Sequence, residues 1–424
     1  MRARTWVLVL ASVFALLQFA TVTGRDTPDS KNYVSYALSL SGEDKRAAAA
    51  ATIDWVCAGQ ASLARRTQSV DVVRFHRPDP TRQVESECRD DEWQRVDRRL
   101  RAGQTEGHIV PFVSPRLKRI FEVRPGYPVF LVPFVTVLGV TWGVWLASVL
   151  VTVAGGVLAF LILRTLSVSV PFALTGQALF YVLPCGATAM RPMTEGLMLA
   201  LTLAAVWGCA LALNGRPRAG TALVGTSLLA LFAVKHSQSL FLGLCLAVAG
   251  AAVAVRRRRR GRAVGRGVPA IAAVACCAAL GTLLLARLLH YPSESESLQD
   301  LLTNHFARPD RARPWPELLQ LEGNFWREWA RRQLGQPLFP VALAAGVWGA
   351  VRRPALGCFL AAAAFTGILT QAGHPDIGIW GDRLIVPAWL LPVVGLPLLL
   401  EPFVRRPLPL PAQGHGERHA HSLR

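Results

Sequence analysis

Long apolar blocks separated by short, arginine-rich turns restrict this chain more than any other feature. Residues 142–162, 193–213 and 268–289 are examples, with at most one charged residue in each block. A helix rises 1.5 Å per residue, so blocks of about 20 residues match the hydrocarbon core of a bilayer. Their backbone groups must bond to one another, and the blocks lack the alternation of barrel strands. We therefore predict transmembrane helices.

The order of apolar and polar segments predicts an all-α polytopic membrane protein with about ten transmembrane helices. The first span follows Arg2 and Arg4, and a cleaved signal peptide is the alternative for it. The expected spans are 5–22, 142–162, 168–184, 193–213, 219–234, 239–255, 268–289, 337–351, 355–372 and 384–400, with a short interfacial helix at 127–138. The chain thus divides into a first span (1–23), a large first loop (24–126), spans two to seven (127–289), a second loop (290–336), spans eight to ten (337–404) and a disordered tail (405–424).

The formal net charge of +19 follows membrane topology rather than a nucleic-acid surface. Nucleic acid is not an expected partner, because no basic face with interleaved aromatic residues occurs outside the apolar blocks. Short positive loops stay in the cytoplasm and contact anionic membrane lipids. Placing the clusters inside gives a multi-pass plasma-membrane protein with cytoplasmic termini and two long extracytoplasmic loops. The clusters are Arg2/Arg4, Arg164, Arg216/Arg218, Arg256–Arg260, Arg352/Arg353 and Arg405/Arg406.

The cysteines fall into two groups. Cys57 and Cys88 both lie in the first large loop and could pair if that loop faces an oxidising compartment. Six others lie in or beside apolar blocks, where they are expected to be inert core residues. No cysteine spacing typical of a zinc site occurs.

Acids directly after the first span are the first candidate for chemistry. Asp26 and Asp29 stand at the mouth of a predicted span, where desolvation raises the pKa of an unpaired acid and suits it to act as a general base. The alternative is that Asp29 caps the helix that begins near Tyr33, and from composition alone capping is the favoured interpretation.

Three further candidates fall on the same predicted side. Glu195 follows Pro192 at the start of a span, where an acid in the first turn is also ordinary capping. Lys235 and His236 interrupt an apolar stretch, and ionisable residues at membrane depth are functional candidates unless Lys235 merely reaches the headgroups. Arg383 can bind phosphate bidentately, or form a surface pair with Asp376 or Asp382.

The second polar loop combines tryptophan with arginine. Trp315, Trp326 and Trp329 lie among several arginines in residues 290–336. This composition favours an interfacial helix at 317–334 near anionic lipid, and sugar stacking or acceptor binding is the alternative.

Several short motifs occur in the order found in one enzyme superfamily. They are Asp29-Ser30-x-x-Tyr33 after the first span, the sequence RPGYP at 124–128, Pro192-x-x-Glu195 before the fourth span, and Asp382-Arg383 with Pro387 before the last span. In order and topology the chain resembles the GT-C glycosyltransferases, in particular protein O-mannosyltransferases and lipid A aminoarabinose transferases. It departs from them at Ser30, where a second acid is common, and at Leu384, where Tyr or Phe is usual.

That resemblance implies a cell-envelope enzyme that transfers a sugar from a polyprenyl-phosphate donor to an extracytoplasmic acceptor. The Arg/Ala/Leu/Gly/Val-heavy composition suggests a high-GC, bacterial genome. It implies that Asp29 is the catalytic base and that Lys235 and Arg383 hold the lipid phosphate. Substrate-binding positions expected alongside them are Asp26, Tyr33, Glu195 and His236. A divalent metal is conceivable as cofactor, although the sequence shows no ligand set for one.

Two other functions fit a chain of this class. A transporter or flippase of a lipid-linked substrate would place polar residues in mid-span and carry repeated halves, and neither is evident. A non-catalytic membrane scaffold would use the first loop for protein contacts and would tolerate alanine at the candidate positions.

Overall fold

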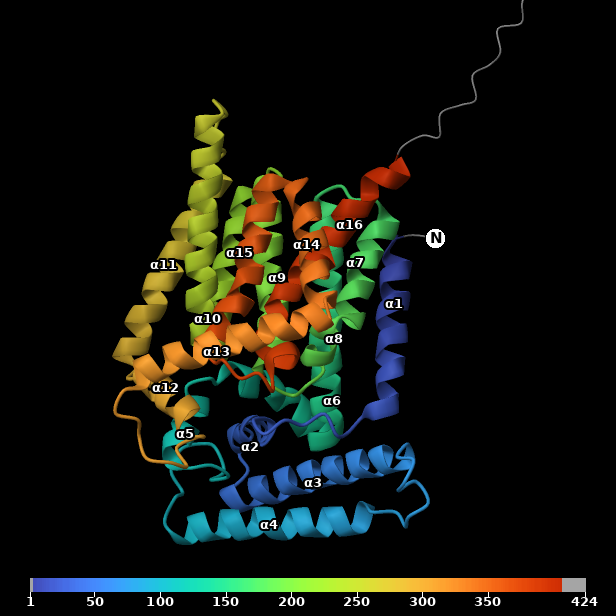
Figure 1. The fold of residues 1–424 in the computed structure, drawn as a ribbon, viewed down its shortest axis with the longest axis vertical. Coiled ribbons are helices and arrows are strands. Elements are labelled where there is room, and N and C mark those ends of the chain that lie inside the picture. The colour runs from blue at the N-terminus through green and yellow to red at the C-terminus, as the bar shows by residue number, and fades with distance from the viewer. Residues whose placement is uncertain (1–2, 406–424) are drawn as a thin grey trace, which may run out of the picture.

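The computed structural model describes residues 3–405, and every regular element in that part of the chain is helical. Figure 1 shows a bundle of upright helices with a smaller helical layer, α2 to α4, across one end. The elements before α9 are α1 (Ala3–Leu17), η1 (Gln18–Thr21), α2 (Ser30–Leu40), α3 (Lys45–Ser69), α4 (Thr81–Arg101), α5 (Pro115–Glu122), α6 (Gly126–Thr165), α7 (Val170–Val182) and α8 (Pro184–Ala189). The remainder are α9 (Thr194–Leu213), α10 (Pro217–Arg259), α11 (Gly267–Leu288), α12 (Glu294–Leu302), α13 (Pro314–Gly335), α14 (Leu338–Val351), α15 (Pro354–Ala372), η2 (Trp380–Leu384), η3 (Val386–Trp389) and α16 (Leu390–Arg405).

The prediction of a multi-pass helical membrane protein is confirmed. Within residues 3–405, seven helices are long and apolar enough to cross a membrane, and the number rises to eight if α13 and α14, which meet at 87°, form one broken span. The predicted span at 168–184 is shorter than expected, because Pro184 ends α7 and starts the short helix α8. The last candidate span covers Val386–Phe403, and the turns η2 and η3 precede its regular helix. The predicted tail lies outside the described residues, apart from Arg405 at the end of α16.

Two of the long helices are interrupted where the sequence indicated a break. Gly139 in α6 has φ +71°, a left-handed conformation that glycine adopts without steric cost. Lys235 in α10 has an extended backbone, with φ −160° and ψ 91°. The hydroxyl of Ser239 donates to the carbonyl of Leu228 at 2.8 Å, although 11 residues would span about 16 Å of straight helix. The halves of α10 therefore fold back on each other with Lys235 at the turn.

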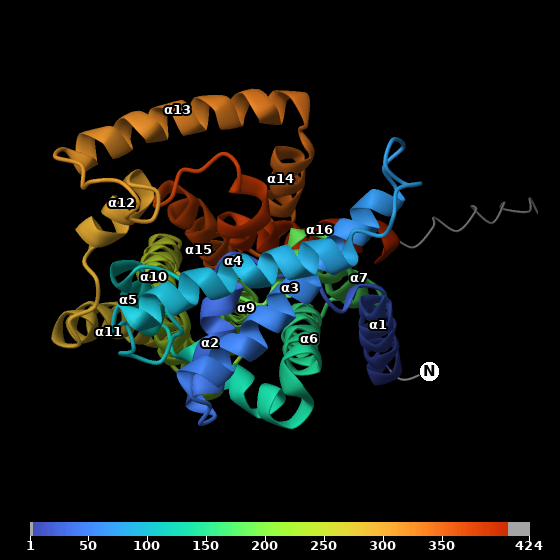
Figure 2. The ribbon, with the colours of Figure 1, turned by 90° about the horizontal axis from the view of Figure 1, so that it is seen from below.

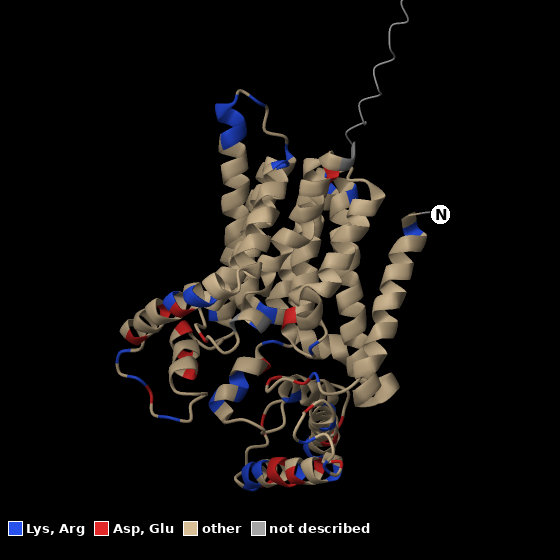
Figure 3. Cartoon of the chain, turned by 45° about the vertical axis from the view of Figure 1, so that its right-hand side comes forward, with Lys and Arg blue, Asp and Glu red and all other residues tan. Residues whose placement is uncertain are grey.

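The arginine-rich turns gather at one end of the bundle. A single cavity brings together Leu166 after α6, Asn214 after α9, Arg256 near the end of α10 and Arg353 before α15. Figure 3 shows the same separation, with basic residues at the helix ends away from the mixed-charge helical layer. The layer and these turns thus lie at opposite ends of the bundle.

The segment between α1 and α6 is a folded layer rather than an irregular loop. Cys57 of α3 and Cys88 of α4 form a disulfide, with Cα atoms 5.5 Å apart, which decides a pairing that the sequence left open. Figure 2 shows α3 and α4 running side by side. Helix α2 lies between this hairpin and the bundle, and its Tyr33 is buried in one apolar cluster with Ile53 of α3 and Leu131 of α6. This packing fixes the start of α2 against the membrane helices.

The second polar segment is joined to the layer through one arginine. Arg116 of α5 forms ion pairs with Glu296 at 2.6 Å and Asp310 at 2.7 Å. Its guanidinium also lies 4.3 Å from the ring centre of Phe306. The helix expected at 317–334 is present as α13. The two segments that the sequence separates by spans are therefore in direct contact.

Candidate functional site

Four charged side chains from distant parts of the chain meet at the end of the bundle that faces α2. Asp29 stands at the start of α2, Glu195 in the first turn of α9, Lys235 at the break in α10 and Arg383 in the turn η2. We call these four residues the ionic cluster. Each was a candidate from the sequence, and the structure brings all of them together.

Glu195 is the centre of the ionic cluster. Its side chain is 1% exposed, and its Oε1 accepts from Arg383 Nε at 2.8 Å and from Lys235 Nζ at 3.4 Å. Its other oxygen accepts from the hydroxyl of Thr194 at 3.0 Å. A buried carboxylate is tolerated only when cations and donors compensate the lost hydration. Helix capping alone does not account for this carboxylate, because it also pairs with buried Lys235 and with the partly buried Arg383.

Arg383 connects the first polar segment to the last one. Its Nη2 donates to Asp29 Oδ2, and its Nε donates to Glu195. Burial opposes the charge of the guanidinium, but Glu195 and Asp29 more than compensate and raise the pKa of Arg383 above its ordinary value. The alternative pairing with Asp376 is wrong, because that carboxylate accepts from the backbone of Gly378 instead. The side chain of Asp382 lies outside the described part.

Asp29 occupies the position before α2, but its side chain caps nothing. The structure records no side-chain hydrogen bond from Asp29 to the first turn of α2. The neighbouring Ser30 hydroxyl instead accepts from the backbone of Thr27 at 2.8 Å. The favoured capping interpretation of Asp29 is therefore wrong for its side chain. Its carboxylate, 20% exposed, is turned to Arg383 and remains reachable from outside.

Lys235 does not extend to the membrane surface. The residue is 7% exposed, and its ammonium lies against Glu195. The break in α10 places this side chain at the end of a hairpin rather than along a continuous helix. The structure therefore contradicts the alternative in which Lys235 simply reaches the headgroups.

Arg124 is a third cation near the ionic cluster, and the sequence did not single it out as a site residue. It is close enough to Tyr33, Lys235 and His236 to act electrostatically on all three. Gly126 permits this approach, since a Cβ there would lie 2.8 Å from the backbone of Val234. The available signal was the sequence RPGYP at 124–128, which counted only as one motif of the family resemblance.

The remaining predicted site residues have different surroundings. Tyr33 is fully buried, and burial raises the pKa of its hydroxyl while Asp29 and Glu195 act on it electrostatically. The ring of His236 packs edge-on against Tyr291, with ring centres 5.1 Å apart. Asp26 lies against Gly59 of α3, and burial raises the pKa of its carboxyl. Within the described part of the chain, Asp26 makes no ion pair with the cluster.

Two histidines lie at the edge of the ionic cluster. His305 belongs to three consecutive residues with left-handed backbone, Asn304 to Phe306, with φ between 53° and 60°. Its Nδ1 lies 3.0 Å from Asp300, and that contact raises the pKa of His305. Burial lowers the pKa of His374, and nearby Arg383 lowers it further. Strained backbone of this kind tends to occur at functional sites.

No metal site is evident among the described residues near the ionic cluster. Among residues 3–405, no group of three or more His, Cys, Asp or Glu side chains is arranged to hold a metal ion. The charges of the ionic cluster are instead compensated by one another.

Comparison with known proteins gave no match to a family model, to a curated protein sequence or to a solved structure. The functional argument therefore depends on the ionic cluster and its position in the bundle.

Proposed function

We propose that this protein is a membrane glycosyltransferase that transfers a sugar from a polyprenyl-phosphate donor to an extracytoplasmic acceptor. One observation carries the proposal: Arg383 contacts both Asp29 and Glu195, which joins an acid and cations from positions up to 354 residues apart. An acid that is partly exposed, set beside buried cations at the end of membrane helices, suits a reaction between a polar acceptor and a lipid-phosphate donor.

The chemistry requires a base on one side of the sugar and positive charge on the other. Asp29 would take the proton of the acceptor hydroxyl while that oxygen forms a bond to C1 of the sugar. The bond from C1 to the donor's phosphate oxygen breaks, and its electron pair stays on the phosphate. Arg383 and Lys235 would stabilise that developing charge, with Arg124 as a third cation. Glu195 holds the two buried cations in place before the donor binds.

The surroundings of the site support this assignment. Stable disulfides occur mainly in oxidising compartments, so the pair Cys57–Cys88 favours an extracytoplasmic position for α2 to α5. With that layer outside, the arginine-rich turns fall on the cytoplasmic side, as the positive-inside rule requires. We infer cytoplasmic termini and about ten passes, with each half of α10 and the short helices α7 and α14 counted as crossings.

A single substitution tests the role of Asp29. Asp29→Asn keeps the shape of the side chain but removes its basicity, so transfer is expected to fall by on the order of 10²- to 10⁴-fold. The measurement is transfer from radiolabelled polyprenyl-phosphate sugars in membranes that contain wild type or variant at equal abundance. Asp91→Asn, at an exposed acid of α4, is the matched control and should leave transfer unchanged.

Full activity of Asp29→Asn would remove the basis of the proposal. Alanine tolerance at Asp29, Lys235 and Arg383 would favour the scaffold alternative. Substrate flux in proteoliposomes without a transfer product would favour a transporter instead.

A further inference from the structure

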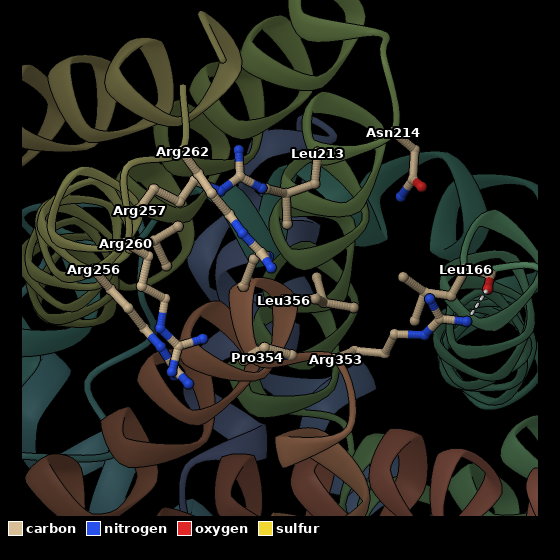
Figure 4. A pocket seen from close by; sticks show the side chains of 12 residues that line it. Leu166, Leu213, Asn214, Arg256, Arg257, Arg260, Arg262, Arg353, Pro354 and Leu356 are labelled. Carbon is tan, nitrogen blue, oxygen red and sulfur yellow. Dashed lines mark hydrogen bonds between the residues drawn. The ribbon is translucent and has the colours of Figure 1, made fainter. Parts of the chain in front are cut away.

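The arginine-rich end of the bundle contains a cavity of about 250 Å³ that is separate from the ionic cluster. Five arginines line this cavity, and none of its other lining residues is acidic. Figure 4 shows Arg256 and Arg260 on one side of the cavity and Arg353 on the other, with the Arg353 guanidinium directed to the carbonyl of Leu166. We call this site the arginine cavity. The lining arginines are Arg256, Arg257, Arg260, Arg262 and Arg353.

The preference of helix C-termini for cations explains the position of only some of these arginines. Arg256 and Arg257 lie in the last turn of α10, where the helix dipole favours positive charge. Arg353 stands at the opposite kind of position, directly before the first turn of α15, where the dipole disfavours a cation. Its Nη2 donates to the carbonyl of Leu166 at 3.4 Å, and a neutral carbonyl does not neutralise the guanidinium charge. An anion between the two walls would compensate both sets of arginines.

The rest of the lining is apolar. Val253, Leu213 and Leu356 form part of the wall beneath the guanidinium groups. The cavity lies where the ends of several apolar helices meet, which is the depth of lipid headgroups. A volume of about 250 Å³ accepts a headgroup but not acyl chains, so the chains of a bound lipid would extend between the helices.

We propose that the arginine cavity binds the headgroup of an anionic phospholipid that carries two phosphate groups. Guanidinium groups bind phosphate bidentately, and the two walls provide separate sets for two phosphates. A lipid with one phosphate leaves one wall uncompensated. The site does not depend on the proposed transfer reaction, because it lies at the other end of the bundle.

The test uses the whole protein, delipidated in detergent and titrated with defined lipids, with bound lipid counted by native mass spectrometry. Wild type is expected to retain one molecule of a lipid with two phosphates. It should prefer this lipid to lipids with a single phosphate that are supplied at the same total charge. The triple variant Arg256→Gln/Arg260→Gln/Arg353→Gln should bind the two-phosphate lipid on the order of 100-fold more weakly. Each arginine near the surface contributes about a factor of five to the affinity.

A matched triple variant distinguishes binding in the arginine cavity from general attraction to positive charge. Arg258→Gln/Arg259→Gln/Arg352→Gln removes the same number of charges from adjacent positions that do not line the cavity. It should change binding by less than about twofold if the cavity is the site.

Equal weakening in both triple variants would overturn the proposal, because it would indicate diffuse attraction to a positive surface. Equal retention of one-phosphate and two-phosphate lipids by wild type would overturn it as well. Displacement of the lipid by an equimolar amount of inorganic diphosphate would show a soluble-anion site and would also contradict it.

Discussion

Arginine residues have opposite surroundings at the two ends of the helix bundle. At one end, Arg383 is buried between Asp29 and Glu195, and Lys235 shares the second acid. At the other end, the arginine cavity collects arginines without any acid in its lining. Figure 3 shows mixed charge over the helical layer at one end and mainly basic charge, with a small acidic segment beside it, at the other.

This difference follows from hydration. Arg258 and its exposed neighbours can be solvated by water or lipid headgroups, so they need no internal partner. Lys235 in the ionic cluster has lost most of that solvation, and the buried carboxylate of Glu195 replaces it. A paired, desolvated charge is a costly feature for a fold to carry, which is why we assign chemistry to the ionic cluster and lipid contact to the other end.

The largest expected effect comes from removing the shared acid. Glu195→Gln leaves Lys235 and Arg383 buried without their common counter-charge, so the free energy of unfolding should fall by about 3–5 kcal/mol. Unfolding by SDS in mixed micelles, followed by tryptophan fluorescence, measures this. The exposed Glu43→Gln is the control and should change the free energy by less than about 0.5 kcal/mol. Equal stability of the two variants would mean that the cluster is not a coupled, desolvated unit.

The same substitution at both ends makes the comparison direct. Arg383→Gln removes charged hydrogen bonds to two acids and should lower the free energy of unfolding by about 1.5–3 kcal/mol. Arg258→Gln, at an exposed position beside the arginine cavity, should stay within about 0.5 kcal/mol of wild type. The same micelle assay applies to both proteins. A larger loss for Arg258→Gln would reverse our assignment of the two ends.

The smallest effect concerns the histidines at the edge of the ionic cluster. His305 should stay protonated to a higher pH than an ordinary histidine, since Asp300 raises its pKa, whereas burial should keep His374 neutral to a lower pH. The His305 contact then stabilises the fold below the ordinary histidine pKa and is lost as the pH rises through the raised value. For His374, stability is full above the ordinary value and is lost as the pH falls toward the lowered one.

Histidine NMR titration of the detergent-solubilised protein measures both shifts. Asp300→Asn should return the pKa of His305 toward the ordinary value and move that of His374 much less, although Asp300, Asp376, Arg383 and His305 all act on His374. Titration of both histidines at the same pH would contradict the geometry at this edge.

The membrane architecture could be predicted because hydrophobicity over about 20 residues is a local property of the chain. The break at Lys235 was foreseen because ionisable residues interrupt an apolar stretch, and the helix at 317–334 was foreseen from its aromatic and basic residues. The pairing of Cys57 with Cys88 remained open in the sequence, because it depends on how α3 packs against α4. Span boundaries near prolines were less accurate, as at Pro184, where one expected span ends early.

The sequence by itself determined which segments enter the membrane and which residues are candidates for chemistry. Only the tertiary structure decided their partners: Arg383 with Asp29 and Glu195 rather than with Asp376, and Asp29 as an ion-pair partner rather than a cap. Burial and charge pairing depend on residues far apart in the chain, so no local pattern reports them. The sequence separated Arg383 from the arginine clusters by predicted topology, but only packing placed Asp29 and Glu195 beside it.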